Sequence, residues 1–406
     1  MKTHNRAKYL LVAAAAASLA LSACSSDSSG GSSSGKDPVK VGIIVSETGV
    51  FSTQAKDFQN GFNAAIDHLT DGTGEVDGHK IEVMVGDDTG DASVGTAKAK
   101  EFLGQGATIL AGTTDSAVAV AVAEQAVQNN ALFIGGTAGT TAFVGMDKKV
   151  FGTSGSSPAG QMIIPEVMGG GDLKGKTLVT IDQDYAFGQT ISKAYKAQLE
   201  PLGVKVVSYL LPVSTTDFTP TMLKVENDAP DFITTTWTGK GYNQLLGSLD
   251  SQGVLEDATF FKPLLLKNDW APVGEALGES IANSTFYLGY YPGATGNEAD
   301  KALQEYAKAN DHSIEYDDAV GWHAGAMVVR AIEEGGTDTE AMAEALQGYS
   351  FEGPAGEVLI RAEDNQVTVP QFTVRLVKKD GEWGVEPLEA FAAKDIEPPV
   401  VNPLDK

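Results

Sequence analysis

The chain has 406 residues, with 54 aspartate and glutamate residues against 29 lysine and arginine residues, and a formal charge of −25. This charge argues against nucleic acid and anionic lipid headgroups as partners of the folded body; it indicates solubility or, alternatively, a cationic ligand. A single cysteine excludes an internal disulfide framework, so stability must come from core burial. A chain of this length suits two lobes better than one core.

The N-terminal segment has the regions of a secretory signal peptide. Lys2, Arg6 and Lys8 precede an apolar stretch over residues 9–21, which is too short for a stable membrane-spanning helix. The stretch ends in L-S-A-C, which resembles the lipobox of bacterial lipoproteins, where the cysteine is acylated and becomes the first mature residue. We therefore expect a lipoprotein signal peptide at residues 1–23 and lipidation at Cys24. The alternative is an ordinary signal peptide in which the cysteine is incidental.

The segment after Cys24 is rich in serine and glycine. Residues 25–35 read SSDSSGGSSSG, a composition that cannot bury apolar surface and is typical of a flexible linker. We expect a tether over residues 24–37, and attachment through two or more acyl chains would be stable. The expected location is the extracytoplasmic face of the cell membrane, at the cell surface or in a periplasm.

Past the tether, apolar runs of strand length alternate with helical patterns, which predicts parallel sheets covered on both faces. Two such series predict an α/β protein with two doubly wound, Rossmann-like lobes. An antiparallel hairpin with an Asp-Gly turn is expected over residues 372–385. The expected strands are 39–45, 80–85, 107–110, 131–134, 176–181, 204–209, 231–236 and 259–265, and the expected helices are 52–69, 92–103, 116–130, 186–202, 220–227 and 242–252.

Loops that follow strands are the places to look for a ligand site, because open α/β sheets bind ligands beyond the carboxyl ends of their strands. Residues 46–49, 111–116 and 135–140 are such loops, and all contain small hydroxyl and glycine residues. Ser116 opens a helix, where backbone N–H groups and the helix dipole favour a carboxylate. A plain helix N-cap is the alternative, and the residue types alone leave both open.

Enzyme chemistry has little support in the sequence. The five histidines are not at metal-ligand spacing, and no H-E-x-x-H motif or cysteine cluster occurs. Residues 152–155 fall short of the G-x-S-x-G nucleophile elbow, and the acidic cluster at residues 87–91 lacks EF-hand spacing. We expect no catalytic residue, no metal and no cofactor.

Several segments in order resemble the leucine/isoleucine/valine-binding branch of the type I periplasmic solute-binding proteins, which deliver ligands to ABC importers. They include VGIIVSETGVFSTQAKDFQNGFNAAIDHL, AGTTDSAVAVAVAEQAVQNNALFIGGTA and DYAFGQTISKAYKAQLEPLGVKVV. The resemblance implies the type I fold, with two lobes joined by three crossovers. Residues 38–156 and 290–365 would form the N-terminal lobe, residues 157–289 and 366–395 the C-terminal lobe, and residues 396–406 a C-terminal tail.

In the first lobe, the resemblance implies a polar half of the ligand site. Ser116 corresponds to the serine that holds the ligand carboxylate. Thr137, Ala138 and Thr140 correspond to the next loop, which contributes a backbone carbonyl and a hydroxyl.

In the second lobe, the resemblance implies an aromatic half. Phe187 stands where the family has a tyrosine, and Trp237 and Thr238 follow a strand into the cleft. Core packing is the alternative for both aromatic residues. Asp269 would pair with a ligand ammonium group.

The implied function is that of a substrate-binding lipoprotein of an ABC importer. Its ligand would be an amino acid of the branched-chain type, or a related amide or small carboxylate with an apolar group. The implied partners are ABC permease and ATPase subunits and, through the N-terminal lipid, the membrane. The alternative is a ligand-sensing subunit of a membrane signalling receptor built on the same fold.

Overall fold

The computed structural model describes residues 36–152, 158–400 and 402–404. The predicted signal peptide, Cys24 and most of the predicted tether lie outside the described residues. The last two residues of that tether belong to the folded body, because the Lys36 N–H donates a hydrogen bond to Gly78 O at 2.9 Å. None of the helices in these described ranges is long and apolar enough to cross a membrane.

The first lobe is built on a six-stranded sheet in the order β2-β3-β1-β4-β5-β6. All neighbouring strands are parallel except β2 and β3, which are antiparallel. The strands are β1 (Val39–Val45), β2 (Glu75–Val76), β3 (His79–Asp87), β4 (Ile109–Gly112), β5 (Leu132–Gly135) and β6 (Val150–Phe151), and the helices between them are α1 (Ser52–Leu69), α2 (Ala92–Gly104) and α3 (Ser116–Gln128).

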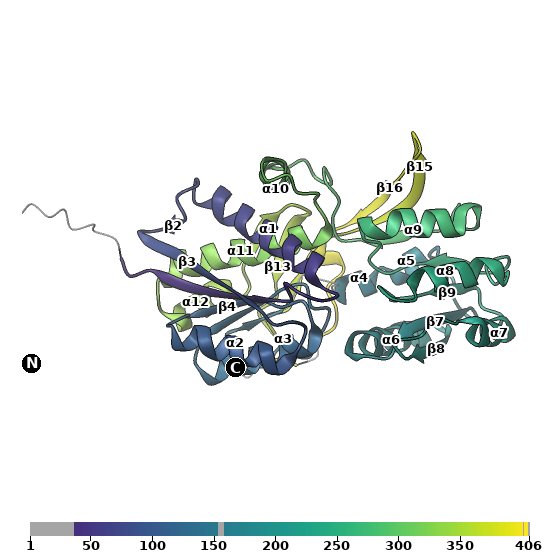
Figure 1. Cartoon of the computed structure of the whole chain (residues 1–406), viewed down its shortest axis with the longest axis horizontal. Coiled ribbons are helices and arrows are strands. Elements are labelled where there is room, and N and C mark those ends of the chain that lie inside the picture. The colour runs from purple at the N-terminus through teal and green to yellow at the C-terminus, as the bar shows by residue number, and fades with distance from the viewer. Residues whose placement is uncertain (1–35, 153–157, 401, 405–406) are drawn as a thin grey trace, which may run out of the picture. The chain divides into compact units, whose positions relative to one another are not determined.

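Helices cover both faces of this sheet, as Figure 1 shows. Ile43 of β1 packs into one core cluster with Phe62 of α1, whereas its neighbour Ile44 packs into another with Phe102 of α2 and Val118 of α3. The alternation follows from the two-residue period of a strand. Residues 41–45 are buried without a break because both faces of β1 are covered, as predicted for a doubly wound lobe.

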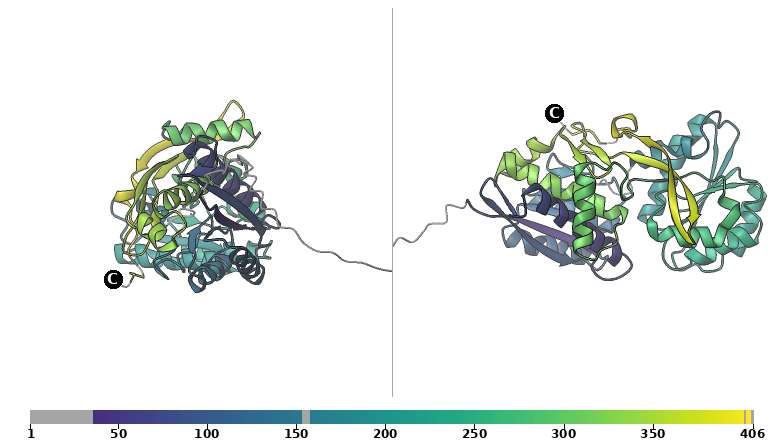
Figure 2. Two further views of the ribbon diagram at one scale, coloured as in Figure 1. Left: turned by 90° about the vertical axis from the view of Figure 1, so that its left-hand side faces the viewer. Right: turned by 90° about the horizontal axis from the view of Figure 1, so that it is seen from above.

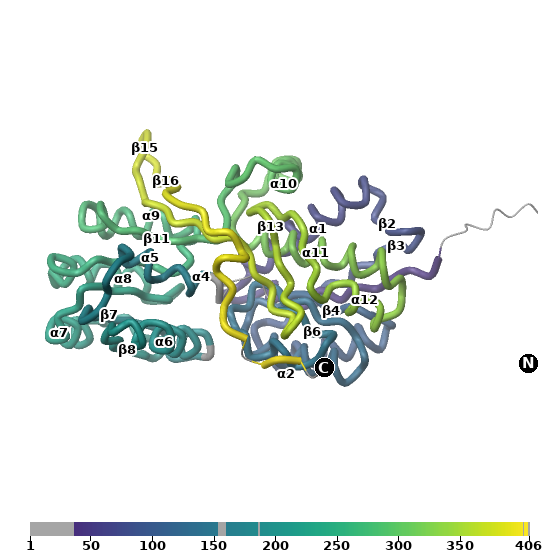
Figure 3. The backbone as a smooth tube through the Cα atoms, turned by 180° about the vertical axis from the view of Figure 1, so that it is seen from behind, coloured from purple at the N-terminus to yellow at the C-terminus, as the bar shows by residue number. Residues whose placement is uncertain are grey.

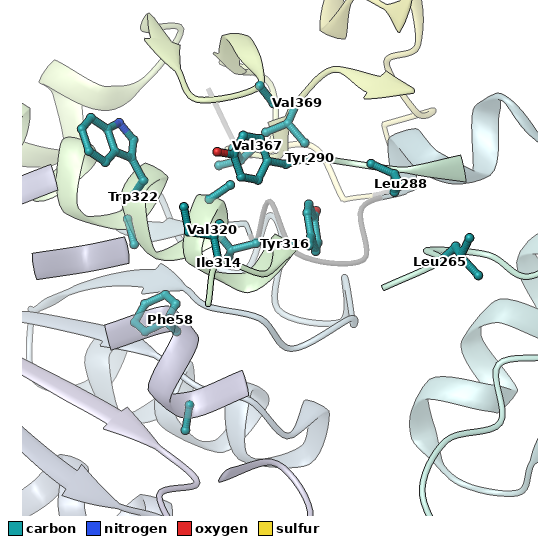
Figure 4. Packing of buried hydrophobic residues seen from close by; sticks show 14 of the residues in the cluster. Phe58, Leu265, Leu288, Tyr290, Ile314, Tyr316, Val320, Trp322, Val367 and Val369 are labelled. Atoms are coloured by element: carbon teal, nitrogen blue, oxygen red, sulfur yellow. The ribbon is translucent and has the colours of Figure 1, made fainter. Parts of the chain in front are cut away.

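The chain later returns to the first lobe with further elements, which are α10 (Glu298–Ala309), α11 (Tyr316–Gly335), α12 (Thr339–Leu346) and the small antiparallel sheet of β12 (Ser350–Gly353), β13 (Gly356–Ile360) and β14 (Val367–Thr368). Helices α1 and α11 pack at very close range, because a Cβ atom on Gly61 would lie 1.7 Å from Asp318 O. Figure 4 shows buried side chains of this region, including Phe58 of α1 and Tyr316, Val320 and Trp322 of α11. This packing fixes the first turn of α11, which carries part of the site.

The second lobe is built on a parallel four-stranded sheet in the order β10-β9-β7-β8. Leu178 of β7 packs in the cluster of α6, and its neighbour Val179 packs in the cluster of α7 and α8, so this sheet is also covered on both faces. The strands are β7 (Thr177–Gln183), β8 (Lys205–Leu211), β9 (Phe232–Thr234) and β10 (Thr259–Phe261), and the helices are α4 (Pro158–Met162), α5 (Ile164–Val167), α6 (Ala186–Leu199), α7 (Thr219–Asp228), α8 (Tyr242–Ser251) and α9 (Lys267–Leu277).

Two of the expected elements end at least three residues earlier in the structure than predicted. The strand expected over residues 259–265 ends at Phe261, because Pro263 cannot donate to a sheet and Leu264 has a left-handed backbone with φ of 53°. The helix expected over residues 186–202 ends at Leu199, and Pro201 falls in a following 3₁₀ turn. The first correction matters for function, because it turns residues 262–266 into a loop.

A third sheet joins β11 (Phe286–Leu288) to the predicted hairpin, β15 (Gln371–Lys379) and β16 (Glu382–Phe391), drawn in yellow in Figure 2. Asp380 and Gly381 have φ values of 52° and 90°, as an Asp-Gly hairpin turn requires. The hairpin contacts α9, since Trp383 Nε1 donates to Glu275 Oε1 at 2.8 Å.

Up to β15 the chain passes between the lobes three times, between β6 and α4, between β11 and α10, and between β14 and β15, which agrees with the predicted fold class. Residues 153–157 of the first pass lie outside the described residues, and the lobe boundaries given above stay predictions. The C-terminal tail returns to the first lobe, where Leu404 N donates to Glu363 O at 2.7 Å (Figure 3).

Candidate functional site

Loops at the carboxyl ends of strands in both sheets line a cavity of about 110 Å³. A wider hollow of about 550 Å³ adjoins it and shares the residues Phe51, Gln54, Tyr185, Thr238 and Leu266. The polar residues of the inner cavity are Gln54, Thr114, Ser116, Thr137, Gln161, Tyr185, Thr236, Thr238, Lys262, Tyr287 and Asp317. The cavity therefore lies where the sheet topology predicts a ligand site.

Ser116 lines this cavity at the first turn of α3. The N-cap of α3 is its neighbour Asp115, whose side chain accepts hydrogen bonds from Ala117 N at 2.7 Å and Val118 N at 3.2 Å. Ser116 is thus not the N-cap. Within the described residues its hydroxyl has no hydrogen-bond partner, so it remains available to a bound molecule.

Thr114 in the same loop is held by a buried chain of hydrogen bonds. Its hydroxyl donates to Ser46 Oγ at 2.7 Å, and the Ser46 hydroxyl donates to Asp88 Oδ1 at 2.5 Å. Burial raises the pKa of Asp88, although the hydrogen bonds from Ser46 and Gly90 oppose this rise. Asp88, which follows β3, therefore holds Thr114 in place at the cavity through Ser46.

The loops after β4 and β5 touch each other. Gly136 N donates to Gly112 O at 2.6 Å, and a Cβ atom on Gly136 would lie 2.6 Å from the Gly112 carbonyl carbon. This contact places Thr137 on the same cavity as Ser116. Thr113 has φ of 85°, a strained value for a β-branched residue and typical of functional sites.

Ala138 and Thr140, also predicted as ligand contacts, do not line the cavity. Ala138 is buried and its N–H donates to Thr113 O at 3.1 Å, which links the two loops. Thr140 Oγ1 accepts from Ala142 N at 3.1 Å and stabilises the next turn. The structure therefore places both residues in the support of the loop.

Phe187 lines the cavity from the start of α6, as predicted for the second lobe. Its ring centroid lies 6.1 Å from that of Tyr185, which lines the cavity beside it. These two rings form an apolar part of the cavity wall.

Trp237, by contrast, is 0% exposed and lies in the core. Its ring packs edge-on against Phe218 at 4.9 Å, and its Nε1 donates to Lys240 O at 2.8 Å. In an extended segment successive side chains point to opposite sides, so Thr236 and Thr238 line the cavity while Trp237 points away. The core-packing alternative describes its position.

Thr236 is fixed by a buried carboxylate, as Thr114 is in the first lobe. Asp182 Oδ1 accepts hydrogen bonds from Thr236 N at 2.8 Å and Thr236 Oγ1 at 2.7 Å. Burial raises the pKa of Asp182, and the Thr236 hydrogen bonds oppose the rise. Each lobe therefore uses one buried aspartate to position a threonine of the cavity.

Asp269, the predicted partner of a ligand ammonium group, is already paired. Its Oδ2 lies 3.0 Å from Lys262 Nζ and also accepts a hydrogen bond from Leu266 N at 3.1 Å. Asp269 lines the wider hollow, and Lys262 is the member of the pair that lines the inner cavity. Lys262 was hidden from sequence reasoning because it fell inside the strand expected over residues 259–265.

Three further polar residues of the cavity come from α4, β11 and α11, and β11 precedes the second pass between the lobes while α11 comes after it. They are Gln161, Tyr287 and Asp317. Gln161 Nε2 donates to the Tyr287 hydroxyl at 3.3 Å. Asp317 carried only a weak signal in the sequence, because acidic residues in a first helical turn are common for electrostatic reasons alone.

Behind Asp317, a buried cluster joins α11 to α1. His312 Nε2 lies 2.9 Å from Asp318 Oδ1 and 3.5 Å from Asp57 Oδ1. The Asp318 carboxylate beside the ring raises the pKa of His312, and burial followed by the Asp318 charge raises that of Asp57 to about 7. The three residues could approach one metal ion. However, Asp318 is already engaged by Asn60 Nδ2 at 2.6 Å, and a protonated histidine accounts for the arrangement.

Comparisons with known proteins agree with this geometry. The profile of the periplasmic binding protein family matches residues 38–382. Leu/Ile/Val-binding protein homolog 6 of Brucella suis biovar 1 (strain 1330) is 27% identical over 365 residues, which cover 85% of this chain and 89% of that protein.

Solved structures resemble the chain over most of its length. An ABC-type branched-chain amino acid transporter protein from Rhodopseudomonas palustris CGA009 is 25% identical with a TM-score of 0.76, over 91% of this chain and 100% of that one. A solute-binding protein from Rhodopseudomonas palustris HaA2, in complex with p-hydroxybenzoic acid, is 22% identical with a TM-score of 0.76, over 88% and 98% of the two chains. The second likeness, at this identity, concerns the fold.

Proposed function

Since this chain belongs to the periplasmic binding protein family, whose members are solute-binding proteins rather than enzymes, we propose that it is the extracytoplasmic substrate-binding lipoprotein of an ABC importer. The observation that carries the proposal is the cavity at the strand ends of both sheets, with Ser116 and Thr137 from one lobe and Phe187 and Thr238 from the other. A ligand there touches both lobes, so it stabilises the arrangement in which both sets of contacts form. A membrane permease would then receive the ligand from that form.

The lining residues favour a ligand with a carboxylate or amide and an apolar group. Hydroxyl groups of Ser116 and Thr137 can donate to oxygen atoms, and Phe187 offers an apolar surface. This chemistry fits the relatives, which are named for leucine, isoleucine and valine or contain p-hydroxybenzoic acid. The names of these relatives favour transport over the sensing alternative. Membrane attachment rests on the lipobox-like sequence at Cys24.

A thermal-shift screen of the soluble body tests this proposal, with branched-chain and aromatic amino acids, their amides and aromatic carboxylates as compounds. A compound present at 100 times its dissociation constant should add about 2.7 kcal/mol to the free energy of unfolding. The proposal fails if no compound of the panel shifts the unfolding temperature.

Ser116→Ala then tests the site itself. Loss of one hydrogen bond to a carboxylate should weaken the binding of a hit by about tenfold or more. Ser93→Ala is the matched control, because Ser93 also lies in the first turn of a helix capped by an aspartate, yet away from the cavity. Equal affinities of both variants would remove Ser116 from the site.

A further inference from the structure

Asp317 is a buried carboxylate on the wall of the cavity without a partner. It is only 6% exposed, and within the described residues its oxygens have no hydrogen bond and no ion pair. Such a group is costly to bury unless something compensates it. In the ligand-free protein a bound proton compensates the burial, and a cationic group that enters the cavity offers the carboxylate a partner in place of that proton.

A second acceptor lines the same cavity. Gln161 is buried, its Nε2 faces the Tyr287 hydroxyl, and in this orientation its Oε1 has no hydrogen-bond partner. Gln161 comes from α4 and Asp317 from α11, so two separate elements bring a residue with an unpaired acceptor oxygen to the wall of one cavity. Acceptors of this kind call for a group that carries several N–H donors.

The surroundings of Asp317 are acidic, and their basic groups are already engaged. Asp57 on α1 and Glu315 and Asp318 on α11 carry the neighbouring charges that, after burial, raise the pKa of Asp317 well above its usual range. Lys262 pairs with Asp269, while Lys267 N and Nζ bind Glu315 and Ser313. His312 lies between Asp57 and Asp318. Among the described residues no basic group lowers the pKa of Asp317, so a positive charge that would ionise it has to be brought by the ligand.

We propose that Asp317, assisted by Gln161, recognises a protonated amine of the ligand, in the role that sequence reasoning gave to Asp269. The ligand class is then an amino acid, with its carboxylate near Ser116, rather than a carboxylate without an amine. This assignment rests on the proposed function and narrows it.

Isothermal titration calorimetry of the soluble body with matched compounds tests the assignment. The pairs are L-leucine with 4-methylpentanoate, L-phenylalanine with 3-phenylpropanoate, and 4-aminobutanoate with butanoate, which differ only by the amine. The wild type should prefer the amine-bearing member of at least one pair by about tenfold or more. Asp317→Asn should weaken the binding of the amine-bearing compound by about 10- to 100-fold, since a charge-assisted hydrogen bond is lost, and leave the affinity for its amine-free counterpart unchanged.

Two controls separate the possible outcomes. Asp91→Asn changes an exposed carboxylate at the start of α2, away from the cavity and the hollow, and should preserve the preference for the amine. The ligand-free Asp317→Asn protein should unfold at the wild-type temperature or above it, because the amide removes an uncompensated buried acid. A large fall in that temperature would identify a structural role and overturn the assignment.

Failure of this inference looks different from failure of the proposed function. Binding of the amine-free compounds as tightly as the amines, or an unchanged affinity in Asp317→Asn, overturns the amine site while the binding function stands. If no compound of any pair binds the wild type, the proposed function and this assignment are both contradicted.

Discussion

Lys262 Nζ lies 3.0 Å from Asp269 Oδ2, and the two side chains are only 3% and 7% exposed. This buried ion pair sits at the edge of the cavity and changes how the site is interpreted. Asp269 pairs with a lysine of the cavity and also stabilises the start of α9, so its charge is already compensated within the protein. The unpaired acid of the cavity is Asp317.

Removing one member of this pair should be strongly destabilising. Asp269→Asn leaves the Lys262 ammonium group buried without its counter-charge, and we expect a loss of about 3–5 kcal/mol in the free energy of unfolding, measured in urea. The exposed pair of Lys98 and Glu101 is the control, and Glu101→Gln should cost about 1 kcal/mol or less. Similar losses in both variants would contradict the buried pair.

Substitutions at two aromatic residues should separate a role in packing from a role in binding. Trp237→Ala removes a fully buried ring and should cost about 3–5 kcal/mol of stability, whereas Trp237→Phe keeps most of the packing and should leave ligand affinity close to that of the wild type. Phe187→Ala should do the reverse, with a small loss of stability and a clear loss of affinity. Urea unfolding and calorimetry measure the two effects, and a loss of affinity in Trp237→Phe would return this residue to the site.

Stability should decrease as the pH rises from about 5 to 8. In the folded protein Asp57 and Glu315 have pKa values raised to about 7, mainly by burial, so they keep protons that the unfolded chain releases near pH 4. The raised pKa of His312 acts in the same direction, because the folded state again binds the proton more tightly. Carboxyl groups with a lowered pKa, such as Asp231, titrate below this window. Buried His323, whose pKa is lowered to about 3, opposes the trend below about pH 6.5, because there only the unfolded chain binds its proton, but it is one group against Asp57 and Glu315 together.

The unfolding free energy in urea at several pH values measures this slope. Asp57→Asn removes one of the titrating groups and should flatten the curve between pH 5 and 8. A stability that rises over this window in the wild type would show that the buried cluster is not protonated as described.

Cys24→Ser should release the protein from the membrane. The expected lipid is attached to this sulfur, and the body alone has a strongly acidic charge that disfavours anionic surfaces. Fractionation of cells should find the variant outside the membrane fraction, with ligand affinity unchanged. Retention with the membranes would contradict the lipid anchor.

The sequence was informative where periodicity and topology decide the outcome. The apolar residues 43–45 of β1 predict a strand buried on both faces. The rule for strand ends selected the loops that carry Ser116 and Thr137, and the family resemblance selected Phe187 and Thr238; all four residues line the cavity. Residue types in loops also predicted the Asp-Gly hairpin. These features depend on local chemistry.

Other parts of the site depend on tertiary contacts that no local pattern contains. Lys262 reaches the cavity because β10 ends at Phe261, before Pro263, and not at residue 265 as expected. Asp269 was predicted to bind a ligand ammonium group, but it pairs with Lys262. Asp317 lies on α11, which returns to the first lobe after two passes of the chain. Acidic residues are common in the first turn of a helix, so its position in the sequence did not indicate a ligand contact. Trp237 was expected in the cleft, but its side chain points into the core, on the side opposite to those of Thr236 and Thr238.

The most direct test of the central claim is the affinity of one ligand for three proteins, measured by calorimetry. The claim is that a single ligand contacts both lobes in the cavity lined by Ser116 and Phe187. Ser116→Ala and Phe187→Ala should each lower the affinity for the ligand by about tenfold or more relative to the wild type. An unchanged affinity in either variant would contradict a ligand held by both lobes at this site.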